Sequence, residues 1–524
     1  MSTTTGAMAL LLALLLLLAP GPAWAQNKPA GELTIALSSF STDVLDPVLG
    51  GHVVKFYLSL IFDHLVGVTP DGQLSKDGGI AHRWEVSPDK KRWTFYLRKG
   101  ARFHNGDEVT AEDVKFSILR AMGKRSTTGY AGPLRVLVQD IETPAPDRVV
   151  IVTKEPTLII PAYLSRGLST EGMVLPKKYI EAKGDDGFAR TGVGSGPYRV
   201  VEQVSGSHVK LEAVDSHWRV GVPKFKTVVF KRIPEEATRI AMLRRGDVDI
   251  VDLSRERVKE VERAGFRVQL KKADAHLDLY WVQPWDNTPI KDKRVREALN
   301  VAIDRPEIAA TIFADLADPG AVPMGFSWAF PGLKFRITPD LAYSFDPARA
   351  KKLLAEAGYP NGFPIDMYAY QLPGLAEGPS MVEAVAGYWQ KIGVQPKIVP
   401  IDYAGFRKKW IDRTIGGSFG YFNLANREWV GTYAYVEKAT SATSPLATIR
   451  DPELDGMLDA VLTQTDQEKI NALMRNIFLR LRSEHLGIPL AYLHTAYATS
   501  KKIGAWNPGT VMYDINIEAL VTSK

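Results

Sequence analysis

The sequence predicts a protein of the α/β or α+β class, because helix and strand patterns alternate along its whole length. Apolar residues at every second position indicate strands, and apolar residues three and four positions apart indicate helices. Gly, Pro and Asp residues stand where one pattern gives way to the next. The chain has 524 residues, 45% of them hydrophobic. It can therefore bury a large core, and its length favours roughly two to four domains.

The clearest local patterns lie within residues 61–119. Aromatic residues alternate with polar ones on both sides of a turn at 87–90, which predicts a β-hairpin with one buried face. Thr110 is then placed to cap a helix, with Asp113 three residues later as an approximate capping box. No catalytic pattern occurs here, so the stretch is interpreted as a packed scaffold.

Similar signals recur along the rest of the chain. Further strands are expected at 31–37, at 227–233, from Tyr198 and at 247–250, and further helices are expected at 238–245, from Asp292, from Asp304, from Asp346 and up to Gly393. Asp292 and Asp346 stand at the positions that cap a helix, and Pro347 fits the first turn after Asp346.

The chain begins with an apolar run at 7–19, followed by a small-x-small pattern that ends at Ala25. The run is too short to span a bilayer, which needs about 20 residues. A secretory signal peptide at 1–25 fits better, with cleavage after Ala25 and a mature start at Gln26. An exported protein in the periplasm is therefore expected.

The composition excludes several classes. The chain has no Cys, so it has neither a disulfide nor a lipid anchor on an N-terminal Cys. Its formal net charge is +6, from 65 basic and 59 acidic residues. This excess is small for the length, and no Lys/Arg run resembles a nucleic-acid arm. A mixed solvated surface and no nucleic-acid partner are expected.

Motifs for chemistry are weak throughout. Residues 192–197 nearly spell a dinucleotide fingerprint, but Pro197 replaces the last Gly and a turn before a strand is favoured. Ser87 and Lys90 have the spacing of penicillin-recognising enzymes, yet Pro88 makes the segment a turn. No pair of His residues has zinc-protease spacing. We therefore predict no catalytic residue, no metal site and no cofactor.

Several ordered segments together resemble a known family, the extracellular solute-binding proteins of family 5, which serve peptide/nickel-type ABC transporters in the periplasm. The matching segments lie in order from about Gly31 to about Tyr492, and the most specific ones are Ala-His-Arg-Trp-Glu-Val at 81–86, Trp-Thr-Phe-Tyr-Leu-Arg-Lys-Gly at 93–100, Phe-His-Asn-Gly-Asp at 103–107, Thr-Ala-Glu-Asp-Val at 110–114 and Gly-Ser-Gly-Pro-Tyr at 194–198.

The resemblance implies an α/β fold of the type II periplasmic-binding-protein kind, with two lobes, strands that cross the hinge, and an inserted subdomain. It further implies that the chain passes between the lobes more than once. The expected division is a first lobe at 26–49, 176–274 and 491–524, an inserted subdomain at 50–175, and a second lobe at 275–490.

The resemblance also implies a ligand site between the lobes, where flat apolar walls and a few polar groups are needed. Aromatic residues with nearby Asn and Arg supply both. The residues expected to bind ligand are Ser39, Phe40, Trp281, Trp285, Tyr421, Asn423, Asn426, Arg427, Trp429 and Tyr492.

One departure from the family bears on the ligand. Peptide-binding relatives hold the ligand's ammonium with an Asp, but Asn423 or Asn426 stands at the matching place here. An Asn supplies no counter-charge for a buried ammonium. Glu428 substitutes for it if the register is shifted, and Arg427 offers a fork for a carboxylate. The ligand is expected to be a peptide or a peptide-like organic anion.

The resulting hypothesis is a monomeric periplasmic binding protein of a peptide-type ABC importer, with permease subunits and their ATPases as partners. Two alternatives stay open. An exported hydrolase would need a nucleophile, a base and an orienting group, and no such set is recognisable. A periplasmic chaperone or sensor on the same fold would have the same sequence features.

Overall fold

One long mixed sheet runs through the molecule, which is described here from a computed structural model. The strand order is β15-β14-β16-β12-β17-β11-β1-β10-β9-β8, with β13 paired to β17 at the side. The structure describes residues 28–69, 73–128, 130–168, 170–219, 221–282, 288–323, 341–372, 375–425, 433, 451–508 and 515–521.

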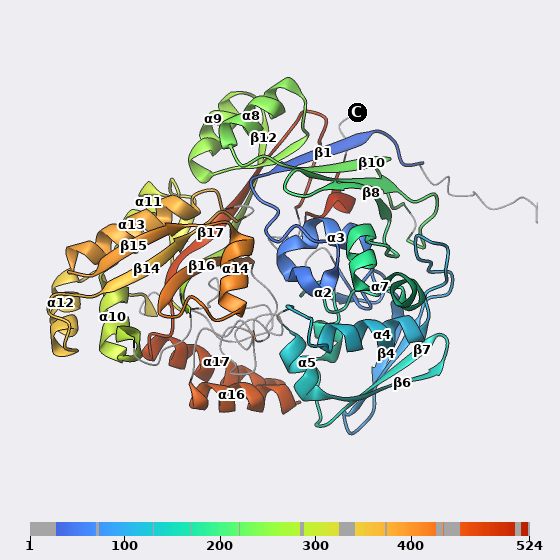
Figure 1. The fold of residues 1–524 in the computed structure, drawn as a ribbon, viewed down its shortest axis with the longest axis horizontal. Helices are drawn as coiled ribbons and strands as arrows, with labels where there is room; N and C mark the ends of the chain where they lie inside the picture. The colour runs from blue at the N-terminus through green and yellow to red at the C-terminus, as the bar shows by residue number, and fades with distance from the viewer. Residues whose placement is uncertain are drawn as a thin grey trace, which may run out of the picture.

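The sheet joins two bodies of the ribbon (Figure 1). We call the body that contains β1, β8–β11 and the expected inserted subdomain at 50–175 the first lobe, and the body that contains β13–β16 the second lobe. The strands of the first lobe are β1 (Glu32–Leu37), β8 (Tyr198–Val204), β9 (His208–Ala213), β10 (Thr227–Arg232) and β11 (Ile250–Asp252), and those of the second lobe are β13 (Ala317–Pro319), β14 (Pro364–Ala369), β15 (Gln395–Pro400) and β16 (Ser418–Ala425).

Two long strands belong to both halves of the sheet. They are β12 (Arg267–Val282) and β17 (Ile488–Thr499), which pair antiparallel. The start of β12 pairs with the end of β17, beside β11, whereas the end of β12 pairs with β16. The ladder between β12 and β17 shifts register between Lys271 and Ala275. Such an irregularity in the hydrogen-bond ladder bends the strand. A bend at this point is consistent with a strand that connects the two lobes.

The first lobe carries a separate four-stranded antiparallel sheet in the order β4-β5-β7-β6. Its strands are β4 (Ala81–Val86), β5 (Arg92–Leu97), β6 (Val138–Ala145) and β7 (Arg148–Thr153), and a small pair is formed by β2 (Gly67–Val68) and β3 (Leu74–Ser75). Trp84 lies opposite Phe95 across β4 and β5, and Trp93, Phe95 and Leu97 are buried. The predicted hairpin is confirmed.

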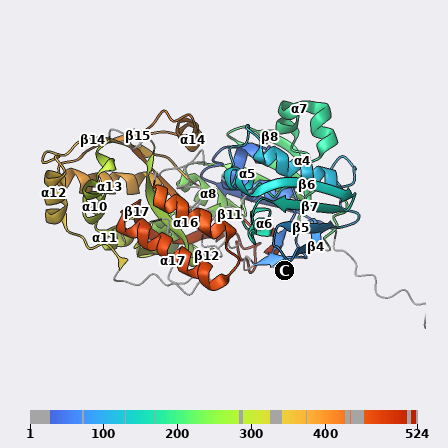
Figure 2. The same cartoon turned by 90° about the horizontal axis from the view of Figure 1, so that it is seen from below.

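Helices cover both lobes, and the turned view in Figure 2 separates the α16–α17 pair of the second lobe from the small sheet of the first. The helices of the first lobe are α2 (Pro47–Gly50), α3 (Lys55–Ile61), α4 (Ala111–Met122), α5 (Ala131–Leu137), α6 (Ile160–Tyr163), α7 (Lys177–Thr191), α8 (Glu236–Arg245) and α9 (Val258–Arg263), and those of the second lobe are α10 (Lys293–Val301), α11 (Arg305–Thr311), α12 (Pro347–Glu356), α13 (Gly378–Lys391), α14 (Tyr403–Ile411), α16 (Pro452–Thr463) and α17 (Gln467–Ser483). Short 3₁₀ turns are η2 (Gly51–Val54), η3 (Arg255–Arg257), η4 (Pro289–Lys291) and η6 (Ile517–Ala519).

The predicted helix starts are also confirmed. Thr110 and Asp113 form a capping box at α4, and the side chain of Asp292 accepts a hydrogen bond from Arg294 N at α10. Asp304 and Asp346 cap α11 and α12 in the same way. These caps satisfy backbone N–H groups that a helix start leaves without partners.

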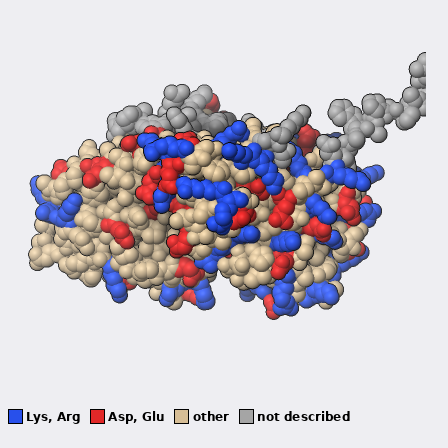
Figure 3. Space-filling view, turned by 90° about the horizontal axis from the view of Figure 1, so that it is seen from above, with Lys and Arg blue, Asp and Glu red and all other residues tan. Residues whose placement is uncertain are grey.

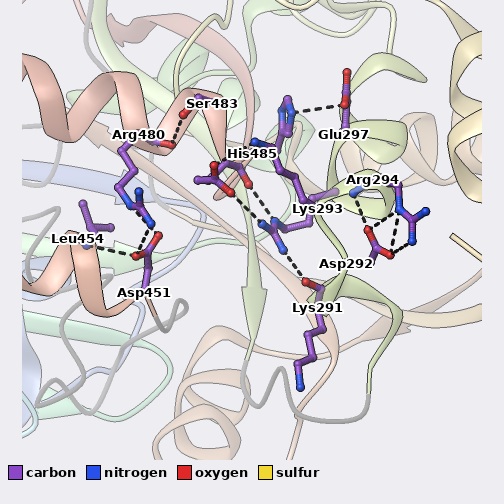
Figure 4. A network of polar contacts seen from close by, with 12 residues as sticks. Lys291, Asp292, Lys293, Arg294, Glu297, Asp451, Leu454, Arg480, Ser483 and His485 are labelled. Atoms are coloured by element: carbon purple, nitrogen blue, oxygen red, sulfur yellow. Dashed lines mark hydrogen bonds and ion pairs between the residues drawn. The ribbon is translucent and has the colours of Figure 1, made fainter.

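Charged pairs fasten the helices of the second lobe to one another (Figure 4). Asp451 accepts from Glu453 N and Leu454 N at the start of α16, and the same carboxylate accepts from Arg480 Nε at 2.9 Å and Nη2 at 2.8 Å. Lys293 on α10 reaches Glu484 beyond α17 at 2.9 Å. The Asp451–Arg480 and Lys293–Glu484 pairs each join two neighbouring elements.

The C-terminal segment is fastened to the first lobe by a second set of ion pairs. Glu518 accepts two hydrogen bonds from Arg219, at 2.6 and 2.9 Å, and lies 3.4 Å from Arg166. Burial raises the pKa of Glu518, but the two guanidinium groups outweigh it and hold the pKa at about 2. The carboxylate is therefore ionised in the folded protein at neutral pH.

Candidate functional site

The candidate site lies where side chains of the second lobe reach the first. Arg407 on α14 is one of them and is buried, with 7% of its surface exposed. Its Nη1 donates to Leu49 O at 3.2 Å and its Nη2 donates to Thr127 O, so the guanidinium binds two segments of the first lobe. Those segments are themselves joined, because Thr127 Oγ1 donates to Leu49 O at 2.9 Å.

The electrostatics of Arg407 are unusual for a buried cation. Its hydrogen-bond partners among the described residues are neutral oxygens of Leu49 and Thr127, and no carboxylate within those residues forms an ion pair with it. Burial lowers the pKa of Arg407, and the neighbouring Tyr403 and Glu171 partly offset that effect. Hydrogen bonds from a charged donor to carbonyls are strong, but they leave the charge itself without a full counter-charge.

Glu171 lies on the first-lobe side of this boundary. Its Oε1 accepts from Tyr130 N at 2.8 Å, while its Oε2 is buried and has no hydrogen-bond partner. The residue is 1% exposed. Thr170, next to it, donates through Oγ1 to Pro47 O at 2.8 Å. Glu171 is thus held beside α2. Leu49 of that helix accepts the hydrogen bond from Arg407.

A second contact joins the two lobes through a pair of opposite charges. Arg255, in η3 of the first lobe, donates from Nη1 to Glu377 Oε2 at 2.9 Å and from its backbone N to Oε1 at 2.6 Å. Glu377 is the residue before α13 of the second lobe. Both side chains are buried. This pair has the matched charges that the Arg407 contact does not have.

The long strand β12 presents a polar face near the same boundary. Asp278 accepts from Tyr280 OH at 2.9 Å and lies 3.2 Å from His276 Nδ1. Tyr492 of β17 lies opposite His276 in the ladder, so side chains of the two residues share one face. Burial raises the pKa of Tyr492 well above its usual range, which keeps the phenol neutral.

Two predicted site residues, Trp281 and Tyr421, lie on the opposite face of the sheet from Tyr492. The ring of Trp281 packs against Phe419 with centroids 4.2 Å apart, and its Nε1 is buried without a partner. Tyr421 stacks on Tyr370 at 4.4 Å, with the ring planes 7° apart. Both residues are buried in contacts within the second lobe.

The two predicted residues of the first lobe, Ser39 and Phe40, follow β1. Phe40 is buried against Phe56 at 5.7 Å and Tyr57 at 6.3 Å, and Ser39 Oγ accepts from Ser41 N at 3.0 Å. The described members of the predicted set thus fall into separate groups on the two lobes. Their role in binding stays a prediction.

The remaining members fall outside the description. Trp285, Asn426, Arg427 and Trp429 lie outside the described residues. Asn423 is described only through its backbone, which lies in β16 opposite Leu277. The comparison of Asn423 and Asn426 with an Asp therefore stays a prediction from the sequence.

A pocket of about 440 Å³ lies elsewhere, within the first lobe. It is lined by the loop at 100–106, by 195–199 and by 213–218, so two of the segments that most resemble the family meet there. His104 bridges two of these loops, since its Nδ1 accepts from Gly194 N and its Nε2 lies 3.0 Å from Gly196 O. His104 thus holds the loop at 100–106 against the turn at 194–196, and the scaffold role of residues 61–119 stays a prediction.

Other features of the described chain bear on the class of protein. No group of three or more His, Asp or Glu side chains in the described ranges is arranged to hold a metal ion. None of the helices within those ranges combines the length and the hydropathy that crossing a membrane requires. Lys and Arg are interspersed with Asp and Glu on the face drawn in Figure 3, which agrees with the predicted mixed surface.

Sequence patterns did not point to Arg407, Glu171, Arg255 or Glu377. Each is a single charged residue in an ordinary helix or loop, and each partner lies far away along the chain. A charged residue at a buried helical position is a weak signal by itself: Arg407 follows Phe406 and precedes Trp410 by one helical turn, and all are buried.

The chain matches the family model of "Bacterial extracellular solute-binding proteins, family 5 Middle" over residues 77–444. Among curated proteins, the heme-binding protein A of Haemophilus influenzae is 24% identical over 443 residues, which cover 80% of this chain and 80% of that protein. That relative is a binding protein by its name, as the resemblance implied.

Solved structures agree on the fold. The ABC transporter-associated periplasmic binding protein DppA from Helicobacter pylori, in complex with the peptide STSA, superposes with a TM-score of 0.83 at 22% identity, over 95% of this chain and 99% of that one. The binding protein AgaA from A. tumefacien R10, in complex with agropinic acid, superposes with a TM-score of 0.81 at 24% identity, over 94% and 98%. The predicted fold of the type II periplasmic binding proteins is confirmed. With its match over most of its length, the chain belongs to the bacterial extracellular solute-binding proteins of family 5.

Proposed function

We propose that this chain is the periplasmic receptor of a peptide-type ABC importer. It captures a small solute, a peptide or a peptide-like organic anion, between its two lobes. Closure of the lobes buries the solute, and the closed form delivers it to the permease subunits, which work with their ATPases. The protein acts as a monomer and performs no catalysis. The family and the solute complexes of DppA and AgaA support this proposal.

The single observation that carries the mechanism is the contact of Arg407 with Leu49 and Thr127 across the lobes. Such a contact exists only when the lobes are together. A solute that touches both lobes favours the same state, because it contributes interactions that the open state does not have. Binding and closure are therefore coupled.

The lobe boundaries proposed for this mechanism are those given by the resemblance: 26–49, 176–274 and 491–524 for the first lobe, 50–175 for the inserted subdomain and 275–490 for the second. The small sheet β4–β7 falls within 50–175, and the strands β13–β16 fall within 275–490. The proposed mature protein begins at Gln26, and Edman sequencing of periplasmic material would test that start.

Closure can be measured directly because the chain has no Cys. Asp186→Cys on α7 and Lys408→Cys on α14 place one spin label on each lobe, at side chains that are 86% and 77% exposed. The solute that copurifies is identified by native mass spectrometry, removed by partial unfolding and added back. A label distance that shortens with one solute per chain, and a solute of unchanged mass afterwards, are expected.

Two results would contradict the proposal. A solute that returns with altered mass would indicate the exported hydrolase. Binding of unfolded proteins alone, with no small solute and no change of label distance, would indicate the chaperone alternative.

A further inference from the structure

The carboxylate of Glu171 presents a buried oxygen that nothing in the described chain satisfies. Oε1 accepts from Tyr130 N, and Oε2 has no hydrogen-bond partner. Leaving such an atom without a donor costs about 1–3 kcal/mol, and more for a charged group. A protein that keeps this arrangement gains stability whenever another molecule brings a donor to the oxygen.

Neighbouring segments hold the backbone around Glu171, and the hydrogen bond from Tyr130 N to Oε1 limits the movement of the carboxylate. Leu65 N donates to Gly172 O at 2.7 Å, and Thr170 Oγ1 donates to Pro47 O. A Cβ at position 172 would lie 2.1 Å from Leu164 O, which leaves no room for this segment to shift toward Leu164. A fixed oxygen is suited to recognition because little ordering is required on binding.

Arg407 does not neutralise Glu171 by an ion pair. Arg407 lies close enough for the two charges to attract, yet no nitrogen of Arg407 comes within ion-pair distance of the Glu171 carboxylate. Its Nη1 and Nη2 are directed to Leu49 and Thr127 instead. A buried carboxylate with only a backbone donor and a more distant cation still favours a direct counter-charge.

We propose that Oε2 of Glu171 binds a cationic group of the solute, a primary ammonium, at the boundary between the lobes. An ammonium donates three hydrogen bonds and carries the full charge that the carboxylate needs. This proposal rests on the proposed function, since the ammonium belongs to the captured solute. Glu171 would then supply the counter-charge from the first lobe. In the second lobe, Asn stands where peptide-binding relatives have the Asp that binds the ammonium.

The test uses trialanine, which has a free ammonium, and N-acetyltrialanine, which has none. Titration calorimetry at pH 7 measures both with the wild-type protein, with Glu171→Gln and with Glu155→Gln. Glu155 is a matched control from the same lobe, since its side chain is 64% exposed and forms a surface ion pair with Lys91. Gln keeps the shape of Glu, removes the charge and replaces one acceptor oxygen with an NH₂ donor.

The proposal expects trialanine to bind the wild-type protein at least 10-fold more tightly than N-acetyltrialanine. Glu171→Gln should remove most of this preference, and Glu155→Gln should leave it unchanged. Thermal unfolding of Glu171→Gln should show a midpoint equal to or above that of the wild type, because an unsatisfied charge is removed.

Three outcomes would overturn the proposal in distinguishable ways. Equal affinity of the wild type for the two peptides excludes an ammonium subsite but leaves the importer function intact. A preference that survives in Glu171→Gln places the ammonium at another residue. Failure of the wild type to bind either peptide contradicts both this proposal and the peptide part of the proposed function.

Discussion

Contacts within a lobe and contacts between the lobes are built differently in this protein. In the α16–α17 network of the second lobe, Arg480 meets the carboxylate of Asp451 at 2.8 and 2.9 Å. Between the lobes, Arg407 meets carbonyl oxygens of Leu49 and Thr127, and Glu171 keeps one oxygen free. Ion pairs with matched charges stabilise contacts that persist. Charged groups without a full counter-charge cost less to separate, as a boundary that opens requires. The Arg255–Glu377 pair is the exception, with matched charges across the lobes.

The largest effect is expected for Glu518, a contact within the first lobe. Its pKa is held at about 2, below the ordinary value of 4.5, by Arg219 and Arg166. A depressed pKa contributes stability above the unfolded value and loses it as the pH falls from about 4.5 to about 2. The loss is on the order of 3 kcal/mol for a shift of this size.

Urea unfolding at pH 6 and pH 3 measures this effect. The Glu518→Gln variant should be less stable than the wild type at pH 6 and should lose much less stability on going to pH 3. An equal pH dependence of the two proteins would show that the Glu518 ion pairs contribute nothing.

A slightly smaller effect is expected for Asp451. Asp451→Ala removes both the cap of α16 and the partner of Arg480, and should lower the free energy of unfolding by about 2 kcal/mol. Asp466→Ala is the control, because Asp466 caps α17 without binding an Arg, and it should cost only about 1 kcal/mol. If both variants lose the same stability, the Arg480 pair adds little. Neither variant should change solute affinity.

The opposite pattern is expected for Arg407. Arg407→Met keeps the apolar stem and removes the hydrogen bonds to Leu49 and Thr127, which form only in the closed state. Hydrogen bonds from a charged group contribute about 1.5–3 kcal/mol, so affinity for trialanine should fall about 10- to 100-fold, while the unfolding midpoint changes little. Lys408→Met is the control, one residue away and 77% exposed. It should change neither the affinity for trialanine nor the unfolding midpoint. A loss of stability without a loss of affinity would place Arg407 among the contacts within a lobe.

The smallest effect is expected for Arg427, whose role is predicted from the sequence alone. Arg427→Ala should weaken binding of an anionic solute by more than about 10-fold, the scale of one charge-assisted pair. Calorimetry with trialanine and its C-terminal amide separates the charge from the rest of the ligand, since only the free carboxylate should respond. Unchanged affinity for trialanine would remove Arg427 from the site.

Local features of this fold could be predicted from the sequence, because their partners are close along the chain. The hairpin β4–β5 and the capping box of Thr110 and Asp113 depend on residues within a few positions of each other. The contact of Arg407 with Leu49 and Thr127 could not be found in this way, because the three residues come from distant parts of the chain. Glu171 was missed for a different reason: an unsatisfied oxygen is visible only when every neighbour is placed.

The pairing of β12 with β17 has a consequence for the speed of capture. Two adjacent strands that pair with each other on both sides of a register shift favour a swing of the lobes about one axis over twisting or sliding. A motion with a single degree of freedom requires no search among alternative arrangements, and hinge motions of this kind take microseconds to milliseconds. The rate of uptake from dilute surroundings is then set by how often solute molecules diffuse into the open form, rather than by rearrangement of the protein.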